Sequence, residues 1–147
     1  MFSQSQLLVA QMRSEMAIAH LALIQAAKYS GIDFTPPQGV QDAARRGLEL
    51  RKEHGRGGMS AQEASKEGIG SGVARATTLA NGKAVSPSTI PRMAAFFSRH
   101  QKNFVAPKAG EKPSNGWISY LLWGGAPGEA WANKVFKQMQ AADEKAS

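Results

Sequence analysis

The chain contains no cysteine, and this absence removes a whole class of chemistry. Without thiols there is no disulfide, no thiolate metal ligand and no cysteine nucleophile. The three histidines, His20, His54 and His100, are far apart and form no HxxxH or HExxH spacing. We therefore expect neither a metal site nor a cofactor.

Acidic residues are missing from one long stretch. Residues 68–110, here called the acid-free block, contain no aspartate or glutamate but six lysines and arginines. Their net charge is +6, against +1 for residues 1–67 and zero for residues 111–147, so nearly all of the chain's +7 lies there. A field concentrated in this way attracts polyanions. The block offers no paired carboxylates, and no Ser/His/Asp arrangement is legible near its serines, so we expect no enzyme.

Strand-forming patterns are also missing. Valine, isoleucine and tyrosine are sparse, no segment alternates apolar and polar residues, and alanine is abundant. The sequence therefore predicts an all-α fold, a compact bundle of five to six short helices with a long N-terminal helix. No basic leader precedes an apolar core, and the apolar run of residues 16–27 is shorter than the roughly 20 residues of a membrane span. We expect a soluble, intracellular protein without a membrane partner.

Three regions are predicted along the chain. Residues 1–35 form an N-terminal helical extension, residues 36–142 a basic helical domain, and residues 143–147 a frayed tail. The helix of the extension runs from about Ser3 to Tyr29, and its apolar residues lie on more than one face. It packs either in the core of the chain itself or against a second copy or another protein.

Within the basic domain, the spacing of apolar residues and the turn residues between them predict six helices. They cover about residues 40–54, 60–67, 73–80, 87–103, 117–123 and 127–141. Ser60 and Glu63 form a capping-box pattern at the start of the second, and Ser114 caps the fifth.

The helix after Ser86 has two contrasting faces. Met93, Phe96, Phe97 and His100 share one face, and Arg92, Arg99 and Lys102 share another with Ala95. A helix held by its apolar face that presents a row of cations suits contact with a phosphate backbone, although a merely solvated basic face has the same pattern. We expect His100 to be structural.

Two further basic elements belong to the same hypothesis. The glycine-rich stretch of residues 68–72, with Gly70 and Gly72, precedes a helix that carries Arg75, so it is either a flexible turn or a phosphate contact. No strand precedes it and it matches no nucleotide-binding P-loop. Arg45 and Arg46 would enlarge the basic surface of the acid-free block if they fold beside it. Asp42 and Glu49 lie close to them in sequence, however, so local ion pairs are equally available to these arginines.

The aromatic residues near the C-terminal end are Trp117, Tyr120, Trp123 and Trp131. At helical spacing such residues are usually core, and stacking on unpaired bases is the functional alternative. Gly124 and Gly125 form a tight corner there, and Gly128 lets the turn pack closely.

Four segments carry a resemblance to a known family. They are Gly70-x-Gly72-Val-Ala-Arg75-Ala, Ser86-x-x-Thr89-Ile-x-Arg92-Met93-x-x-Phe96-Phe97-x-Arg99-His100, Gly116-Trp-Ile118 and Leu122-Trp123-Gly124-Gly125-x-x-Gly128-x-x-Trp131. Together they resemble a small module of tailed-phage proteins, sometimes attached to head or prohead-protease proteins. The resemblance spans about residues 40–136 and carries no catalytic residue. Members often have an acidic residue where this chain has Ala126. The resemblance implies a phage origin and expression in the cytoplasm of a bacterial host, with packaging in the virion as a further option.

These observations converge on one functional hypothesis and one alternative. The first is a non-enzymatic protein that binds nucleic acid through backbone phosphates with little sequence preference. Its predicted binding residues are Arg75, Lys83, Arg92, Arg99, Lys102, Gly70, Gly72, Arg45 and Arg46. The alternative is a virion or head-associated structural protein, or an inhibitor of a host protein. In that case residues 3–29 supply the contact, including contact between copies of the chain.

Overall fold

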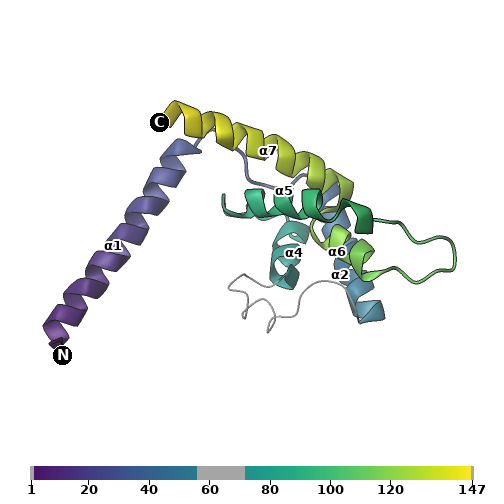
Figure 1. Cartoon of the computed structure of the whole chain (residues 1–147), viewed down its shortest axis with the longest axis horizontal. Coiled ribbons are helices and arrows are strands. Elements are labelled where there is room, and N and C mark those ends of the chain that lie inside the picture. Colours follow the sequence, from purple (N-terminus) through teal and green to yellow (C-terminus); the bar gives the residue numbers. More distant parts are fainter. Residues whose placement is uncertain (1, 56–71, 147) are drawn as a thin grey trace. The chain divides into compact units, whose positions relative to one another are not determined.

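The computed structural model describes residues 2–55 and 72–146, and in these ranges every regular element is a helix (Figure 1). The elements are α1 (Gln4–Lys28), α2 (Gln38–His54), α4 (Gly72–Ala80), α5 (Thr89–Arg99), the 3-10 helix η1 (Gln101–Asn103), α6 (Asn115–Leu122) and α7 (Gly125–Ala146). The predicted all-α class with a long first helix is confirmed. The helix predicted over residues 60–67 lies outside the described residues.

The chain divides into two compact units. One comprises Met1–Ile32 together with Met139–Ser147, and the other comprises Asp33–Gln138. The described cations of the acid-free block all belong to the second unit.

In the first unit, α1 begins with a complete capping box. The Ser3 hydroxyl accepts a hydrogen bond from the Gln6 N–H, and the Gln6 side chain accepts one from the Ser3 N–H. No residue of α1 is buried in the described part of the chain. At its end the helix is tied to residue 143, because the Tyr29 hydroxyl donates to the Asp143 carboxylate at 2.7 Å and the Lys28 ammonium pairs with it at 3.0 Å.

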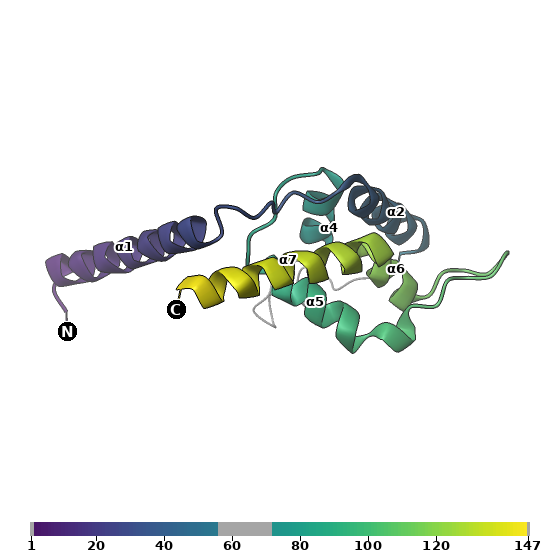
Figure 2. The same ribbon diagram turned by 90° about the horizontal axis from the view of Figure 1, so that it is seen from above.

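The second unit is organised around α2, which packs against α4 and α6. Its buried apolar residues come from every helix of the unit, namely Val40, Ala44, Leu50, Ala76, Leu79, Ala80, Val85, Ile90, Met93, Phe97, Ile118, Leu122, Trp131, Ala132 and Val135. Ser114 caps α6 as predicted, accepting a hydrogen bond from the Trp117 N–H at 3.1 Å. The segment between η1 and α6 extends away from the helices as a loop (Figures 1 and 2).

Two glycines allow helices to approach more closely than a side chain permits. A Cβ on Gly47 of α2 would lie 2.7 Å from the Leu122 backbone nitrogen of α6. A Cβ on Gly128 would lie 2.7 Å from the Trp123 carbonyl oxygen, as the predicted tight corner requires. Real Cβ atoms do not approach this closely, so the backbones at both crossings would have to separate.

Three predicted helix boundaries need correction. The helix predicted to start at Pro87 starts at Thr89, and residues 86–89 form a turn in which the Thr89 N–H donates to the Ser86 carbonyl. Its predicted continuation to residue 103 is instead broken at His100 and followed by η1. The last helix, predicted to end near Ala141, continues to Ala146.

Candidate nucleic-acid interface

The five predicted cations of the acid-free block come from consecutive elements of the second unit. Arg75 lies on α4, Lys83 in the loop that follows it, Arg92 and Arg99 on α5, and Lys102 in η1. Four of them are exposed and Arg75 is half-buried. Among the described residues none of these five, here called the block cations, forms an ion pair. Their charge therefore remains uncompensated by any described carboxylate.

The predicted division of α5 into two faces is observed. Ile90, Met93 and Phe97 are buried, whereas Arg92 and Arg99 are exposed. The two arginines are seven residues apart, so they lie on the same side of the helix and about 10 Å apart along its axis. The buried face holds α5 in the unit, which leaves the two guanidinium groups in solvent.

Arg75 occupies a different environment from the other block cations. Its guanidinium carbon lies 3.6 Å from the centroid of a Trp123 ring, a cation–π contact between α4 and the end of α6. Burial, with a smaller effect from the positive charge of Arg92, lowers the pKa of Arg75 to about 10. Arg75 and Arg92 are thus close enough to repel each other.

Trp123 belongs to an aromatic cluster that links α5, the residue after η1, and α6. It stacks on Phe96 with ring centroids 4.6 Å apart, and further ring contacts connect the remaining members. The cluster comprises Phe96, Phe97, His100, Phe104, Trp117, Tyr120 and Trp123. Because its rings contact one another, the cluster has a packing role, and His100 is among the packed rings. Burial, with the charge of Glu129, raises the pKa of Tyr120.

Arg45 and Arg46 differ from the block cations because each has an intramolecular partner. Arg45 donates to the Ala80 carbonyl at 3.0 Å and to the Asp42 carboxylate at 3.4 Å, which joins α2 to the end of α4. Arg46 pairs with Glu49 at 3.1 Å. Both arginines therefore form local ion pairs with carboxylates of α2.

The two glycines of the predicted site are only partly covered by the structure. Gly72 is the first residue of α4. Gly70 lies outside the described residues, as does most of the glycine-rich stretch.

A hollow between α4 and the start of α5 was not found from the sequence. Its volume is about 280 Å³, and we call it the α4–α5 pocket. It is lined by Ala74, Arg75, Thr78, Ala84, Val85, Ser86, Thr89 and Arg92. Two block cations and three hydroxyl groups therefore meet in one place. In the sequence Ser86 marked the start of a predicted helix and Thr89 was only part of a longer motif, and nothing local linked either of them to Arg75.

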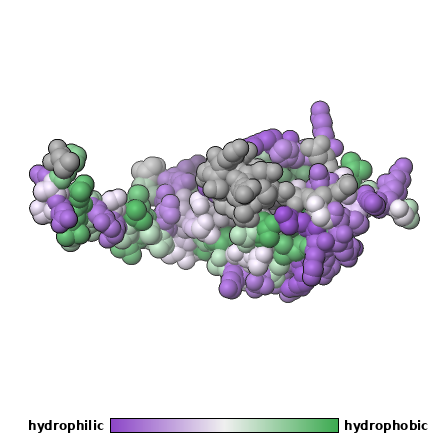
Figure 3. Space-filling model, turned by 90° about the horizontal axis from the view of Figure 1, so that it is seen from below, coloured by the Kyte–Doolittle hydropathy of each residue, from purple (hydrophilic) through white to green (hydrophobic). Residues whose placement is uncertain are grey.

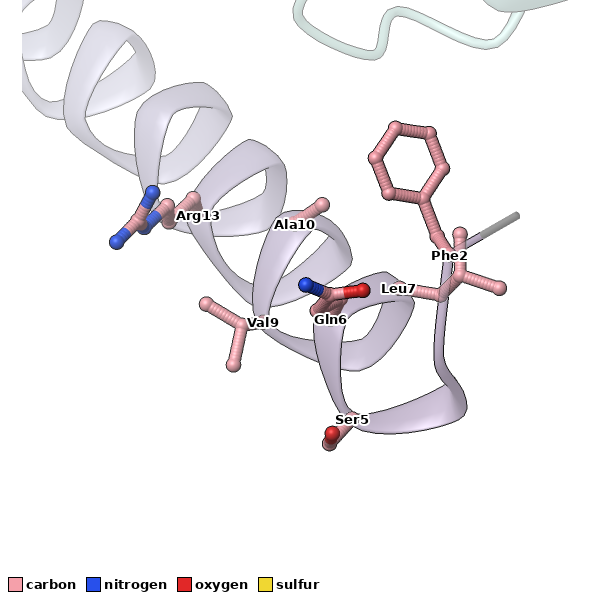
Figure 4. A pocket seen from close by; sticks show the side chains of 7 residues that line it. All are labelled: Phe2, Ser5, Gln6, Leu7, Val9, Ala10 and Arg13. Carbon is pink, nitrogen blue, oxygen red and sulfur yellow. The ribbon is translucent and has the colours of Figure 1, made fainter.

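Two other hollows have a different character. One of about 580 Å³ lies between α2, α6 and the loop before α6, and carries charges of both signs, including Glu53, Glu111 and Lys112. Another, of about 480 Å³, is lined only by Phe2 and the first turns of α1 (Figure 4). Its side chains all come from one helix and the residue before it, so it is a surface crevice.

The part of the chain that the structure describes contains no group of three or more metal-ligating side chains. No protein-family model, curated protein or solved structure matches this chain.

Proposed function

We propose that this protein binds nucleic acid through backbone phosphates, with little sequence preference and without catalysing a reaction. The observation that carries the proposal is the contrast between two sets of cations. Arg45 and Arg46 are neutralised by carboxylates of their own helix, whereas no described carboxylate pairs with the block cations. Uncompensated arginines and lysines on a folded surface are the groups that phosphate contacts require.

The exposed cations of α5 suit a repeating anionic ligand better than a single small one. Arg92 and Arg99 project from the same side of one helix, about 10 Å apart along its axis. That separation exceeds the reach of a single phosphate group and is comparable with the distance spanned by one or two nucleotides of a backbone. Contacts of this kind fix a strand in place but read no base edge, so we expect weak sequence preference.

The test is fluorescence anisotropy of the full chain with labelled single-stranded and double-stranded oligonucleotides of unrelated sequences. We expect binding at low salt that weakens steeply as salt increases, with similar affinities for different sequences. The variant Arg92→Glu/Arg99→Glu should lose binding yet retain its helical content by circular dichroism, because both side chains are exposed. Undiminished binding by this variant would refute the proposal.

A second candidate function rests on the exposure of α1. All large apolar residues of this helix are exposed, namely Leu7, Leu8, Val9, Met12, Met16, Ile18, Leu21, Leu23 and Ile24. Hydrophobic side chains, in green, are visible on the surface of α1 in Figure 3. A helix with this much exposed apolar surface is normally covered. We propose that α1 associates with α1 of a second copy, as a structural protein of a phage particle would use it. The resemblance to a tailed-phage module supports that setting.

Sedimentation velocity tests this second function. Met16→Glu/Leu23→Glu places two charges one above the other on α1 and should reduce the mass of the assembly. Gln11→Glu/Gln25→Glu adds the same charge at positions that are already polar, and should leave the assembly intact. A monomeric native chain would exclude self-association.

A lipid membrane is the alternative partner for the exposed apolar residues of α1. By length and composition the helix is able to cross a membrane, with a mean hydropathy of 1.3 over 18 residues, although core helices and signal sequences meet the same criterion. Cosedimentation of the monomeric chain with phospholipid vesicles would favour that alternative.

A further inference from the structure

The α4–α5 pocket brings together side chains that suit an anion. Arg75 and Arg92 line it with the hydroxyl residues Thr78, Ser86 and Thr89, and no carboxylate is among the residues that form it. Pockets for drug-sized ligands measure about 300–1,000 Å³, so a volume of about 280 Å³ suits a smaller group. The lining therefore indicates a small anion rather than a large apolar molecule.

The two arginines of the pocket are left in mutual repulsion. Arg92 contributes to the lowered pKa of Arg75, and neither guanidinium forms an ion pair with a described carboxylate. Burial of Arg75 adds a desolvation penalty, because its contact with Trp123 provides only an aromatic face. An anion between the two guanidinium groups would turn the repulsion into two favourable interactions.

Hydroxyl groups at the start of α5 supply a further donor. The Ser86 hydroxyl lies 3.2 Å from that of Ser88 and 3.0 Å from that of Thr89. Three hydroxyls have three protons, and two contacts between them use only two. When Ser88 donates to Ser86 and Ser86 donates to Thr89, the Thr89 proton is left for a ligand in the pocket.

Several other polar groups nearby are already occupied. The Thr78 hydroxyl donates to the Ala74 carbonyl at 3.1 Å. At the start of α5 the N–H groups of Thr89 and Ile90 donate to turn carbonyls, and Pro91 has no N–H. Anion binding in this pocket therefore depends on side chains, the two arginines above all, and not on the backbone of the helix terminus.

We propose that the α4–α5 pocket binds one phosphate group, held between the guanidinium groups of Arg75 and Arg92 with a hydrogen bond from Thr89. In this form the pocket is one phosphate position of the nucleic-acid-binding face, so the inference rests on the proposed function. The remaining exposed block cations, Lys83, Arg99 and Lys102, then contact neighbouring phosphates without a pocket.

The test uses inorganic phosphate and the full chain. Phosphate is titrated by calorimetry at constant ionic strength, with chloride replaced by phosphate. Arg92→Gln is compared with Arg99→Gln, because both remove one exposed cation from α5 but only Arg92 lines the pocket. We expect Arg92→Gln to weaken phosphate binding at least about tenfold, because a charged hydrogen bond is lost. Arg99→Gln should leave the affinity for phosphate within about twofold of the native value, because Arg99 does not line the pocket.

Thr89→Val checks the hydroxyl, and the midpoint of unfolding checks that each variant is folded. Thr89→Val should weaken phosphate binding by a smaller factor than Arg92→Gln, since it removes a neutral donor. Equal losses in Arg92→Gln and Arg99→Gln, or no phosphate binding by the native chain at millimolar concentration, would overturn the pocket proposal.

The same variants separate the pocket from the wider function. If oligonucleotides bind and inorganic phosphate does not, the pocket proposal fails and the proposed function stands. If phosphate binds with the expected dependence on Arg92 but oligonucleotides do not bind, the pocket stands and serves a small phosphate compound instead. If both ligands bind, phosphate should compete with the oligonucleotide for the native chain, and this competition should be lost in Arg92→Gln. That result identifies the strand backbone as the source of the phosphate in the pocket.

Discussion

The salt dependence of binding gives the sharpest quantitative test of the proposed interface. If all five block cations contact phosphates of duplex DNA, log K should fall with log salt at a slope of about −4.5, from about 0.9 per neutralised phosphate. Raising salt from about 50 to about 200 mM would then weaken binding on the order of 500-fold. Removing one contact with Arg99→Gln should reduce the slope to about −3.6 and the loss to about 150-fold.

Arg46→Gln is the matched control for this experiment. Arg46 is also an exposed arginine on a helix, but it pairs with Glu49 at 3.1 Å. Its replacement removes the same side chain and charge, yet we expect the slope to stay near −4.5 because no phosphate contact is lost. The slope is measured by anisotropy at five or more salt concentrations. Equal reductions in the two variants would refute the division into paired and unpaired cations, and a slope near zero would refute phosphate binding.

Two further predictions concern stability. Gly47→Ala should lower the free energy of unfolding by about 1–3 kcal/mol, because its Cβ would meet the Leu122 nitrogen at 2.7 Å. Gly31→Ala, where no atom lies within 4 Å, should cause no such loss, and equal urea midpoints would contradict the close crossing. The hydrogen bond from Tyr29 lowers the pKa of Asp143. The contribution of this hydrogen bond to stability is therefore present above pH about 4 and is lost as the pH falls through that lowered pKa. The protection factors of amides near residue 143, which correct for the slower intrinsic exchange in acid, should therefore fall as the pH is lowered, and Tyr29→Phe should already show lower protection factors at neutral pH.

Local sequence patterns predicted the elements of the fold and the faces of α5. Apolar residues at helical spacing identified Met93 and Phe97 as buried, and the spacing of Arg92 and Arg99 placed these two cations on a different face, in solvent. The Ser114 cap was likewise predicted from a side chain that acts on its own helix. Such features depend on neighbours within one or two turns, so the sequence contains the information that they need.

The start of α5 shows where a local pattern was interpreted incorrectly. Ser86-Pro87 is typical of a helix start, but a helix from Pro87 would place Pro91 at the fifth position. There its missing N–H would break the bond to the Pro87 carbonyl. Starting at Thr89 places Pro91 in the first turn, where no intrahelical donor is needed. The position of the second proline therefore decided the boundary.

The α4–α5 pocket and the role of Arg45 depended on tertiary structure. Arg75 and Arg92 are 17 residues apart and meet only because α4 and α5 pack in one unit. Arg45 donates to Ala80, 35 residues away. Neither relation has a periodic signature in one sequence. The exposure of α1 could not be predicted from the sequence either. An apolar helix has the same composition whether its partner is in the same chain or in another.

The environment of Arg75 argues for a binding role over a purely structural one. A half-buried cation beside a second cation costs stability, and its contact with Trp123 is worth about 0.5–2 kcal/mol. An apolar side chain at this position would fill the same space beside the indole without desolvating a charge or repelling Arg92. A guanidinium is favoured there once an anion lies between the two arginines, since the anion replaces their mutual repulsion with two attractive interactions. The feature that weakens the free protein is therefore the one that gives the pocket its affinity for phosphate.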